Sequence, residues 1–477
     1  MGRGRGRPRP RPGGARVIDL ARVGAISDPD GDGRAGGGAC DDRIRVTLRL
    51  AGERLAEVRF GADACASATA AMARLAALAE GRTLLDAARL GRADVGDVDS
   101  PACALTAVDA LHAALGDAVV RGAGAAPDAT RVGVAMSGGV DSALVLAEAV
   151  DEGRAALGLT LRLWIDPAAP APERACCAPD SVRRARDLCH ALGVPHLMLD
   201  LREPFRAAVV DPFVAGYAAG ETPNPCATCN GAFRFDALDG VATRLGCTEW
   251  RTGHYARLVE RDGRFLVARG ADPLKDQSAM LALVDPGILG RVRLPLGDRV
   301  KAAVVGDARG RGLAAADAPE SQEVCFLGGG ALAPFLARQG VALGAGPIVD
   351  EEGAVLGAHA GAVAYTPGQR RGLGVSRGTE PLHVLRVEPA TNTVVVGRLS
   401  RLGRRAVPLR DVVVHAPAER VEACFRVRAE PIPGVLEPDG RGGAVVRLVR
   451  DAYQAAPGQV CVLYDGDCVV AAGVVAG

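Results

Sequence analysis

Lysine is almost absent from this sequence of 477 residues. Of its 57 basic residues, only Lys275 and Lys301 are lysines. The abundance of alanine and arginine is typical of a GC-rich coding bias, so a lysine that remains is informative, because ammonium and guanidinium groups are not interchangeable. The formal net charge is only +1. Binding to a nucleic acid must therefore come from local arginine clusters and not from the field of the whole protein.

Targeting signals and long apolar runs are absent as well. No stretch approaches the roughly 20 apolar residues of a membrane span. The Arg/Pro/Gly-rich segment over residues 1–16 lacks the apolar core of a secretion signal. We predict a disordered basic tail there and a cytoplasmic protein that has no membrane contact. The thirteen cysteines are an odd number in a chain without such a signal, so we expect buried, reactive or metal-bound thiols and no disulfide framework.

The stretch from Val132 to Ser142 carries the clearest chemical signal. Its apolar run, Val132–Met136, predicts a buried parallel strand, and a helical pattern begins near Ser142. The intervening Ser137-Gly-Gly-Val-Asp-Ser142 aims backbone N–H groups and a helix N-terminus at an anion. It is neither a Walker loop nor the dinucleotide Gly-x-Gly-x-x-Gly. The pattern predicts a phosphate-binding loop of another class, and an ordinary strand–helix turn with two glycines is the alternative.

The periodicity of the chain predicts several domains, as its length also suggests. Residues 17–122 predict an α+β domain. Strand–helix alternation over residues 131–330 predicts an α/β domain with a doubly wound parallel sheet, whose ligands bind at the carboxyl ends of the strands. Short strand-like runs predict a small central β-rich domain over residues 331–400 and a β-barrel over residues 401–477.

Three cysteines of the first domain lie at expected element boundaries. Cys40 precedes the first strand, and Cys65 and Cys103 each begin a helix, where the helix N-terminus favours the thiolate. Together with Asp42 they are candidate ligands for zinc or an iron–sulfur cluster. Three buried structural cysteines are the alternative that spacing alone leaves open.

Two polar segments of the α/β domain carry further candidates. Two prolines in residues 220–230 predict an extended loop, which holds the Cys-x-x-Cys pair Cys226 and Cys229. Such a pair serves redox chemistry, a cluster, half of a zinc site or a structural turn. Lys275 lies in the polar segment 272–278, where it suits either a phosphate contact or a solvated charge.

Several of these motifs resemble known families. The loop at residues 137–142 resembles the pyrophosphate loop of the ATP-pyrophosphatase superfamily, whose members adenylate a carbonyl oxygen. The segments around Cys40, Cys65 and Cys103 resemble the cysteine segments of the NifU/IscU iron–sulfur scaffold family. That resemblance implies a nascent cluster or zinc at these cysteines and Asp42.

Residues 131–477 resemble the tRNA-uridine 2-sulfurtransferase (2-thiouridylase, MnmA) family along nearly their whole length. The matching motifs follow the family's order. They are Ser137–Ser142, Cys176-Cys177, Thr222–Asn230, Thr252–Arg257, Lys275–Ser278, Glu320–Phe326, Gly368–Leu373 and Ala456–Gln459.

The resemblance implies ATP-dependent 2-thiolation of the wobble uridine of tRNA. ATP, held with Mg²⁺, adenylates uridine O2, pyrophosphate leaves and sulfur arrives at C2. The implied ATP contacts are Ala135, Met136, Ser137, Gly138, Gly139, Val140, Asp141, Ser142, Leu161 and Gly253. The implied tRNA contacts are His254, Lys275, Asp276, Gln277, Arg370, Arg371 and Gln459, with further phosphate contacts from the arginines of residues 401–405. Asp141 orders the loop or the metal, Cys325 bears a persulfide, and Cys229 activates or resolves it.

Some alternatives stay open at this point. Cys226, Cys229 and Cys325 are alternatively ligands of a [4Fe–4S] cluster whose open iron carries sulfide. The first domain donates sulfur, assembles a [2Fe–2S] or [4Fe–4S] cluster, or binds zinc. We expect the tRNA anticodon stem-loop and a cysteine desulfurase or sulfur relay protein as partners of a monomer or weak dimer. An iron–sulfur or sulfur carrier without thiolation activity is the alternative function, and an amidotransferase-type synthetase is a more distant one.

Overall fold

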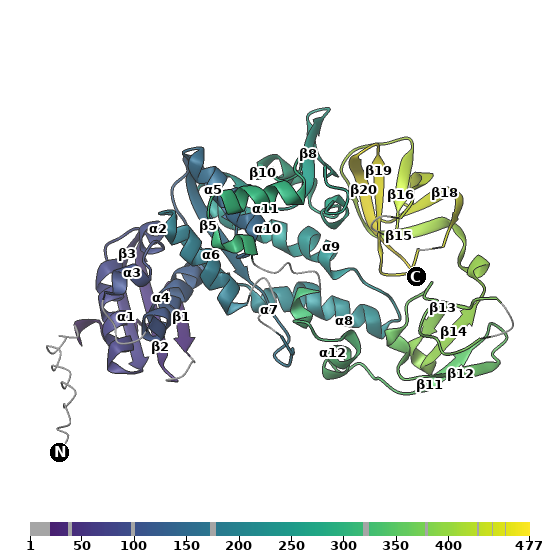
Figure 1. The fold of residues 1–477 in the computed structure, drawn as a ribbon, viewed down its shortest axis with the longest axis horizontal. Coiled ribbons are helices and arrows are strands. Elements are labelled where there is room, and N and C mark those ends of the chain that lie inside the picture. The colour runs from purple at the N-terminus through teal and green to yellow at the C-terminus, as the bar shows by residue number, and fades with distance from the viewer. Residues whose placement is uncertain are drawn as a thin grey trace, which may run out of the picture. The chain divides into compact units, whose positions relative to one another are not determined.

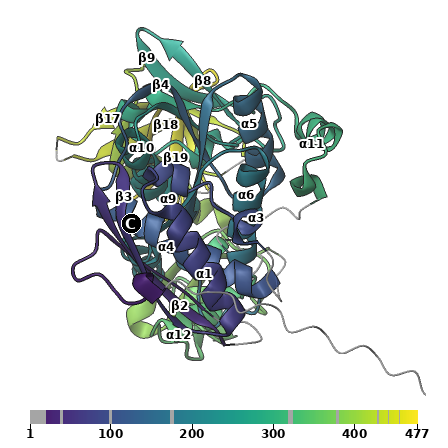
Figure 2. The same cartoon turned by 90° about the vertical axis from the view of Figure 1, so that its left-hand side faces the viewer.

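The computed structural model describes most of the chain. The described residues are 20–36, 41–96, 101–171, 178–317, 324–376, 380–426, 429–440, 442–453 and 455–477. The predicted tail lies outside them, as do Cys40, Cys176 and Cys177. The chain divides into two compact units, residues 1–125 and 126–477, and most of their elements are labelled in Figures 1 and 2.

The first unit is an antiparallel sheet covered by helices. Its sheet has the order β1-β2-β3, formed by β1 (Gly31–Gly36), β2 (Arg43–Ala51) and β3 (Arg54–Asp63). Its helices are α1 (Ala66–Ala79), α2 (Leu84–Ala87), α3 (Arg92–Val95) and α4 (Pro101–Arg121). Val46 and Leu48 of β2 and Val58 of β3 are fully buried, as the period of two in a half-buried strand requires. The predicted α+β class is confirmed.

Strand β1 has no strand signal in its sequence, Gly-Asp-Gly-Arg-Ala-Gly. Its glycines allow a close approach of α4, because a Cβ on Gly33 would lie 2.0 Å from the backbone nitrogen of Ala114. A Cβ on Gly31 would lie 2.3 Å from the carbonyl oxygen of the same alanine. Helix packing, and not strand propensity, therefore explains the composition of β1.

Helix α4 is the one described segment with the length and hydropathy of a membrane span. The expectation that no apolar segment approaches the length of a membrane span was therefore too strict, because this helix, rich in alanine, is long and apolar enough. Within its apolar window 67% is buried inside the protein, where α4 packs on β1 and β2. We interpret α4 as a core helix.

The second unit begins with a parallel sheet of order β10-β7-β4-β5-β6. Its strands are β4 (Asp128–Ala135), β5 (Ala155–Arg162), β6 (His196–Asp200), β7 (Cys247–Arg251) and β10 (Val292–Arg293). The chain passes from β4 to β5 and β6, and then returns on the other side of β4 as β7. The strand order reverses at β4, so the crevice beyond the carboxyl ends of β4 and β7 is the place where a ligand is expected.

Helices cover both faces of this sheet. On one face, Val132 and Val134 of β4 share a core with α5 (Val140–Asp151), α6 (Pro179–Ala191) and α11 (Lys301–Gly310). On the other face is α10 (Phe235–Arg244), because a Cβ on Gly133 would lie 3.5 Å from the Cβ of Ala242 in that helix. The predicted doubly wound class is confirmed.

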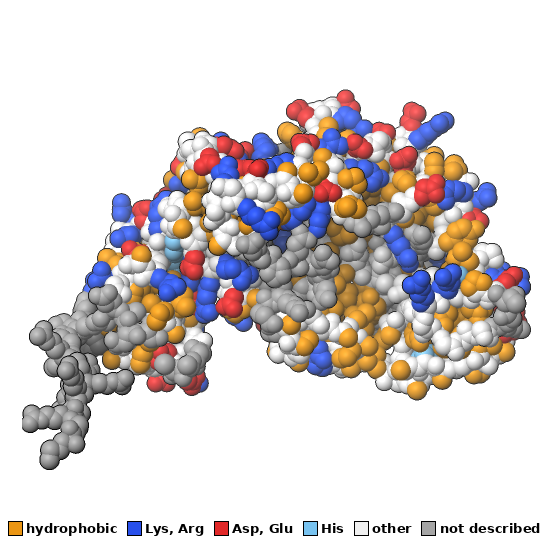
Figure 3. All heavy atoms as spheres, viewed as in Figure 1, with side chains coloured by type: hydrophobic (Ala, Val, Ile, Leu, Met, Phe, Trp, Pro, Cys, Tyr) orange, Lys and Arg blue, Asp and Glu red, His pale blue; other side chains and the backbone are white. Residues whose placement is uncertain are grey.

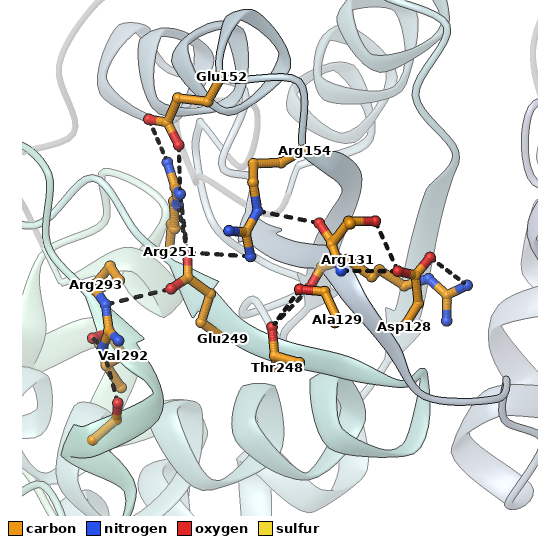
Figure 4. Close-up of polar contacts among 12 residues, drawn as sticks. Asp128, Ala129, Arg131, Glu152, Arg154, Thr248, Glu249, Arg251, Val292 and Arg293 are labelled. Atoms are coloured by element: carbon orange, nitrogen blue, oxygen red, sulfur yellow. Dashed lines mark hydrogen bonds and ion pairs between the residues drawn. The ribbon is translucent and has the colours of Figure 1, made fainter.

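Ion pairs fix β7 between its neighbours (Figure 4). The side chain of Arg251, a residue only 8% exposed, donates to Glu152 at the end of α5 (2.8 Å) and to Glu249 of β7 (2.9 Å). The second carboxylate oxygen of Glu249 lies 3.4 Å from Nε of Arg293 in β10. This network links the end of helix α5 with strands β7 and β10, and the two least exposed charges in it, those of Arg251 and Glu249, compensate each other.

A mostly helical segment connects β6 to β7. It contains α7 (Arg202–Phe205), α8 (Asp211–Ala218), α9 (Pro225–Cys229) and α10, with π-helical turns at residues 206–210 and 230–234. The predicted extended loop over residues 220–230 is therefore wrong in its second half. Pro225 is the first residue of α9, where the missing N–H costs nothing, and the side chain of Asn224 caps the helix by accepting from the N–H of Ala227 at 3.3 Å.

The last third of the chain holds the two predicted β domains. After α12 (Leu332–Arg338), the central sheet has the order β12-β11-β14-β13. Its strands are β11 (Gly346–Val349), β12 (Val355–His359), β13 (His383–Glu388) and β14 (Thr393–Gly397).

The C-terminal domain is a closed barrel. Its strands are β15 (Arg404–Val414), β16 (Val421–Cys424), β17 (Ile432–Pro438), β18 (Ala444–Ala452), β19 (Val460–Asp465) and β20 (Cys468–Val475). Pairing of β15 with β20 closes the ring. A hairpin of the α/β domain, β8 (Ala256–Arg261) and β9 (Arg264–Arg269), extends the same sheet beside β20. No pattern in the sequence predicts this addition.

Candidate functional site

The loop between β4 and α5 has the geometry of an anion cradle. Gly138 has a φ of +74°, and a Cβ there would lie 2.4 Å from the carbonyl oxygen of Ser181. Gly139 is the N-cap of α5 and has no side chain with which to satisfy the first N–H groups of the helix. The first N–H groups of α5 therefore have no side-chain cap, and a phosphate bound there would accept from them.

Two serines brace the loop. The hydroxyl of Ser142 accepts from the N–H of Ser137 (3.2 Å) and donates to the carbonyl of Gly139 (3.0 Å). The hydroxyls of Ser137 and Ser142 lie 3.2 Å apart. The loop is thus held in shape by its own side chains before any ligand arrives.

A cavity of about 170 Å³ opens beside this loop. It brings together most of the predicted ATP contacts with two of the predicted tRNA contacts. Its lining is Ala135, Met136, Ser137, Asp141, Ser142, Leu159, Leu161, Arg234, Leu238, Thr252, Gly253, His254 and Gln277. Gly138, Gly139 and Val140 complete the loop and begin α5. Arg234 and Leu238 were missed in the sequence because they lie on a helical segment whose motif is the cysteine pair.

Asp141 is held by two residues from outside the loop. Both of its carboxylate oxygens accept from Nζ of Lys301, at 2.7 and 2.8 Å, and one accepts from the hydroxyl of Tyr255 at 2.6 Å. Gly253 lies directly behind, since a Cβ there would approach the Cβ of Asp141 to 2.8 Å. Lys301 was noted in the sequence as one of two lysines, but nothing there connected it to the loop.

His254 is held in an uncharged state. Its Nδ1 lies 2.9 Å from the hydroxyl of Thr252, and its ring centre lies 5.6 Å from that of Phe235. Burial, and secondly the nearby Arg234 guanidinium, lower the pKa of His254 to about 3. At neutral pH the ring therefore offers one donor and one acceptor, and no charge.

The predicted catalytic cysteines lie on two separate elements. Cys229 ends α9 and is 7% exposed, whereas Cys226, three residues earlier, is exposed. Cys325 begins a short 3₁₀ turn and is partly exposed. The next residue, Phe326, is buried among Phe205, Phe213 and Phe335, with ring centres 5.2 to 6.2 Å away. An aromatic cluster thus anchors the turn that carries Cys325.

The helical segment that carries Cys229 continues to the nucleotide cavity. Residues 225–244 run without interruption through α9, a π-helical turn and α10. Arg234 and Leu238 on this segment line the cavity. At about 1.5 Å per residue, Cys229 lies roughly 8 Å along the helix axis from Arg234.

The segment that precedes α9 is attached to both β domains. The N–H of Thr222 donates to the carbonyl of Pro457 at 2.8 Å, and the side-chain amide of Gln459 donates to the carbonyl of Thr222. Glu221 accepts from Arg410 of the barrel at 2.6 Å. A Cβ on Gly220 would lie 3.0 Å from the carbonyl oxygen of Val387 in β13. Gln459, expected at the tRNA, thus makes an internal contact in this structure.

The other predicted tRNA contacts fall into two groups. Asp276 accepts from the N–H groups of Gly270 (2.9 Å) and Ser278 (3.0 Å), and Gln277 accepts from the N–H of Tyr255 (2.8 Å), so both order their loop. Lys275 is partly exposed, whereas Arg370 and Arg371 are exposed. Basic and acidic side chains intermix over the face drawn in Figure 3.

The first unit holds a candidate metal site. One ligand atom from each of Asp42, Cys65 and Cys103 lies within 4.8 Å of the others, and no second such group of His, Cys, Asp and Glu occurs among the described residues. The two thiol sulfurs are 3.4 Å apart, and the N–H of Cys65 donates to Asp42 at 2.8 Å. Cys65 is the N-cap of α1 and Cys103 lies in the first turn of α4. Cys226, Cys229 and Cys325, although described, do not form such a group.

Comparisons with known proteins agree with this architecture. Four family models match: a NifU-like N-terminal domain at residues 19–123, a tRNA methyl transferase HUP domain at 130–329, a tRNA methyl transferase PRC-barrel domain at 334–398, and an aminomethyltransferase beta-barrel domain at 410–475. The fold and the site define a nucleotide-binding α/β domain joined to a cysteine-bearing scaffold-like domain.

Curated relatives cover the whole chain or its second unit. The bifunctional protein NifU/MnmA of Rubrobacter xylanophilus is 42% identical and spans 96% of this chain and 97% of its own. The tRNA-specific 2-thiouridylases MnmA of Sorangium cellulosum and Chloroflexus aurantiacus are 41% and 40% identical over 66% and 67% of this chain, and 84% and 90% of their own. The chain belongs to the family of bifunctional NifU/MnmA proteins. The resemblance noted in the sequence is confirmed for both parts.

Proposed function

We propose that this protein is an ATP-dependent sulfurtransferase that converts a uridine of the tRNA anticodon loop, at the wobble position, into 2-thiouridine. The observation that carries the proposal is the helical segment 225–244, which joins a cysteine pair to a phosphate-binding cavity. The segment places the thiol of Cys229 roughly 8 Å along its axis from Arg234, a residue that lines the cavity. The 2-thiouridylase activity named for the relatives also needs a sulfur source beside a nucleotide.

The cavity fits ATP in its shape and its donors. The glycine loop leaves room for phosphate oxygens where a Cβ would clash, and the start of α5 supplies N–H donors for the departing pyrophosphate. Leu161 and Met136 offer apolar surface for the adenine. Mg²⁺ accompanies the phosphates and neutralises part of their charge.

Two steps complete the proposed reaction. Uridine O2 attacks the α-phosphorus of ATP, pyrophosphate leaves, and the O2-adenylated uridine keeps its activated C2. The terminal sulfur of a persulfide on Cys325 then attacks C2, and AMP leaves with the original oxygen. The thiolate of Cys229 attacks Sγ of Cys325, which releases 2-thiouridine and leaves a Cys229–Cys325 disulfide. A thiol reductant restores both cysteines, and a cysteine desulfurase or relay protein restores the persulfide.

The first unit is proposed to hold a metal centre or to pass on sulfur. Asp42, Cys65 and Cys103, with Cys40 as a fourth ligand, suit zinc or a [2Fe–2S] cluster through their thiolate and carboxylate donors. This group also supports a second function, that of an iron–sulfur or sulfur carrier. A [4Fe–4S] cluster on Cys226, Cys229 and Cys325 remains an alternative proposal for the sulfur step, although the structure does not group the three thiols.

The test is an anaerobic reaction with unmodified tRNA, Mg-ATP, a cysteine desulfurase and cysteine, followed by mass spectrometry of the digested nucleosides. We expect 2-thiouridine with the wild type and none with Cys229→Ala or Cys325→Ala. Cys247→Ala, which removes a buried cysteine of β7, is the matched control and should retain activity. Absence of thiouridine with every donor, sulfide included, would move the assignment to the carrier function.

A further inference from the structure

Lys301 is the first residue of α11, and its side chain is directed at the start of α5. The backbone N–H of Lys301 donates to Asp272 at 3.0 Å, which fixes where α11 begins. Its ammonium contacts both carboxylate oxygens of Asp141 and lies 5.5 Å from the ring centre of Tyr255. Its side chain is 13% exposed, whereas that of Asp141 is 30% exposed. The ion pair is therefore largely removed from water, on the rim of the cavity.

The charge of the cavity shows what this ion pair does. Among the lining residues, only Asp141 and Arg234 carry charge at neutral pH, because His254 is neutral. A carboxylate at the second position of α5 lies where the polyphosphate of ATP must bind. The negative charges of the carboxylate and of the polyphosphate repel each other strongly when they lie close together in a partly buried site. The ammonium of Lys301 offsets this charge before the nucleotide arrives.

A lysine suits this place better than the arginine that the chain uses elsewhere. An ammonium is a compact charge with three donors, which here reach both oxygens of one carboxylate beside an aromatic ring. A guanidinium is larger and planar, and it would have to displace Tyr255, a residue only 3% exposed. This accounts for one of the two lysines in the sequence.

On the basis of the function proposed above, we propose that Lys301 is a positioning residue that neutralises Asp141, so that Asp141 orders the phosphate loop and does not bind magnesium. Lys301 and Tyr255 hold the carboxylate, and neither of them lines the cavity. The loop then presents N–H and hydroxyl donors to ATP without an opposing charge.

The test is a double-mutant cycle on binding of Mg-ATP to the full chain without tRNA, measured by calorimetry. Lys301→Met leaves the carboxylate uncompensated and should weaken ATP binding by about tenfold or more. Lys301→Met combined with Asp141→Asn removes the repulsion and should bind ATP within about threefold of wild type. Arg309→Met, which removes a positive charge from the same helix, is the matched control and should bind as wild type does.

Nucleotide-free melting curves accompany each variant. Asp141→Asn alone serves as the second probe if Lys301→Met does not fold, and it should keep ATP binding within about threefold of wild type because it removes the carboxylate charge that Lys301 offsets. The inference is overturned if Asp141→Asn alone abolishes binding and the double variant binds no better than Lys301→Met, since that is the behaviour of a magnesium ligand. A wild type that binds no ATP would instead remove the proposed function, and the inference with it.

Discussion

At the scale of single residues, Gly138 combines two constraints that can be measured separately. Alanine there must adopt a positive φ and must also displace the Ser181 carbonyl oxygen, 2.4 Å from its Cβ. We expect Gly138→Ala to lower the free energy of unfolding by about 2–3 kcal/mol and to weaken ATP binding, measured by urea unfolding and calorimetry.

Gly153 provides the matched control for this substitution. It has a φ of +72°, and nothing lies within 4 Å of the position that a Cβ would take. Gly153→Ala therefore reports the cost of backbone strain alone, about 1 kcal/mol. If both variants lower the free energy of unfolding by the same amount, the contact with Ser181 has no energetic effect.

His254 makes the stability of the protein depend on pH. Its pKa of about 3 in the folded protein is below the value of about 6.5 in an unfolded chain. Between these two values the unfolded state binds a proton that the folded state does not. The contribution of the neutral His254 to the free energy of unfolding is therefore fully present above pH 6.5 and is lost as the pH falls toward 3. We expect the melting temperature of His254→Gln to fall less than that of wild type between pH 7.5 and 5. Parallel curves for the two proteins would show that the ring is protonated in the folded state.

At the scale of elements, the short helix α9 depends on its cap. Asn224 supplies the side-chain cap at the N-terminus of the helical segment 225–244, of which α9 is the first part. Asn224→Ala should cost about 1 kcal/mol, and the fraying should raise the rate at which Cys229 reacts with iodoacetamide by roughly fivefold. Mass spectrometry of the labelled peptide measures that rate.

Thr83→Ala is the control for the cap. Thr83 caps α2 in the other unit by accepting from the N–H of Asp86 at 3.1 Å, so its loss should leave labelling of Cys229 unchanged. A faster labelling of Cys229 in both variants would indicate general destabilisation and not fraying of α9.

Several elements were predictable because a local pattern determines them. The strand, glycine turn and helix around residues 132–151 follow from the spacing of the apolar residues and from the position of the glycines. The alternation of apolar and polar residues likewise predicts the strand pair of the first unit and the barrel strands. β1 was not predictable, because its glycines are required by the packing of α4, a helix about 80 residues later in the chain. The start of α9 was missed because a proline indicates a helix breaker unless its position in the first turn is known.

The candidate site was predictable in part for a similar reason. Residues within one motif, such as Ser137 and Asp141, could be grouped from the sequence. Lys301 and Arg234 could not, because only the packing of α11 and of the π-helical turn 230–234 beside the sheet brings them to the loop. The roles assigned to the individual residues stay predictions.

At the scale of the whole molecule, the two compact units can be separated between residues 125 and 126. A fragment of residues 126–477 keeps every residue of the nucleotide cavity. We expect it to bind Mg-ATP within about twofold of the full chain, since no lining residue is lost. Calorimetry checks this, and 2-thiouridine formation by the fragment with sulfide as donor would show that the first unit acts upstream of the transfer step. Loss of ATP binding in a folded fragment would mean that the units are coupled.

The hairpin β8–β9 has a consequence for how the protein is made. It leaves the ribosome roughly 200 residues before β20, the strand beside which it pairs through Ala268 and Cys468. Until then β9 has an exposed edge. Arg261 and Arg257 of β8 also lack their salt-bridge partners, Asp465 and Asp467, which have not yet been synthesised. The α/β domain therefore reaches its final form only after the last strands of the barrel have been synthesised. A nascent chain that stalls within the barrel would expose this edge, which makes it a candidate for chaperone binding or for pairing between chains.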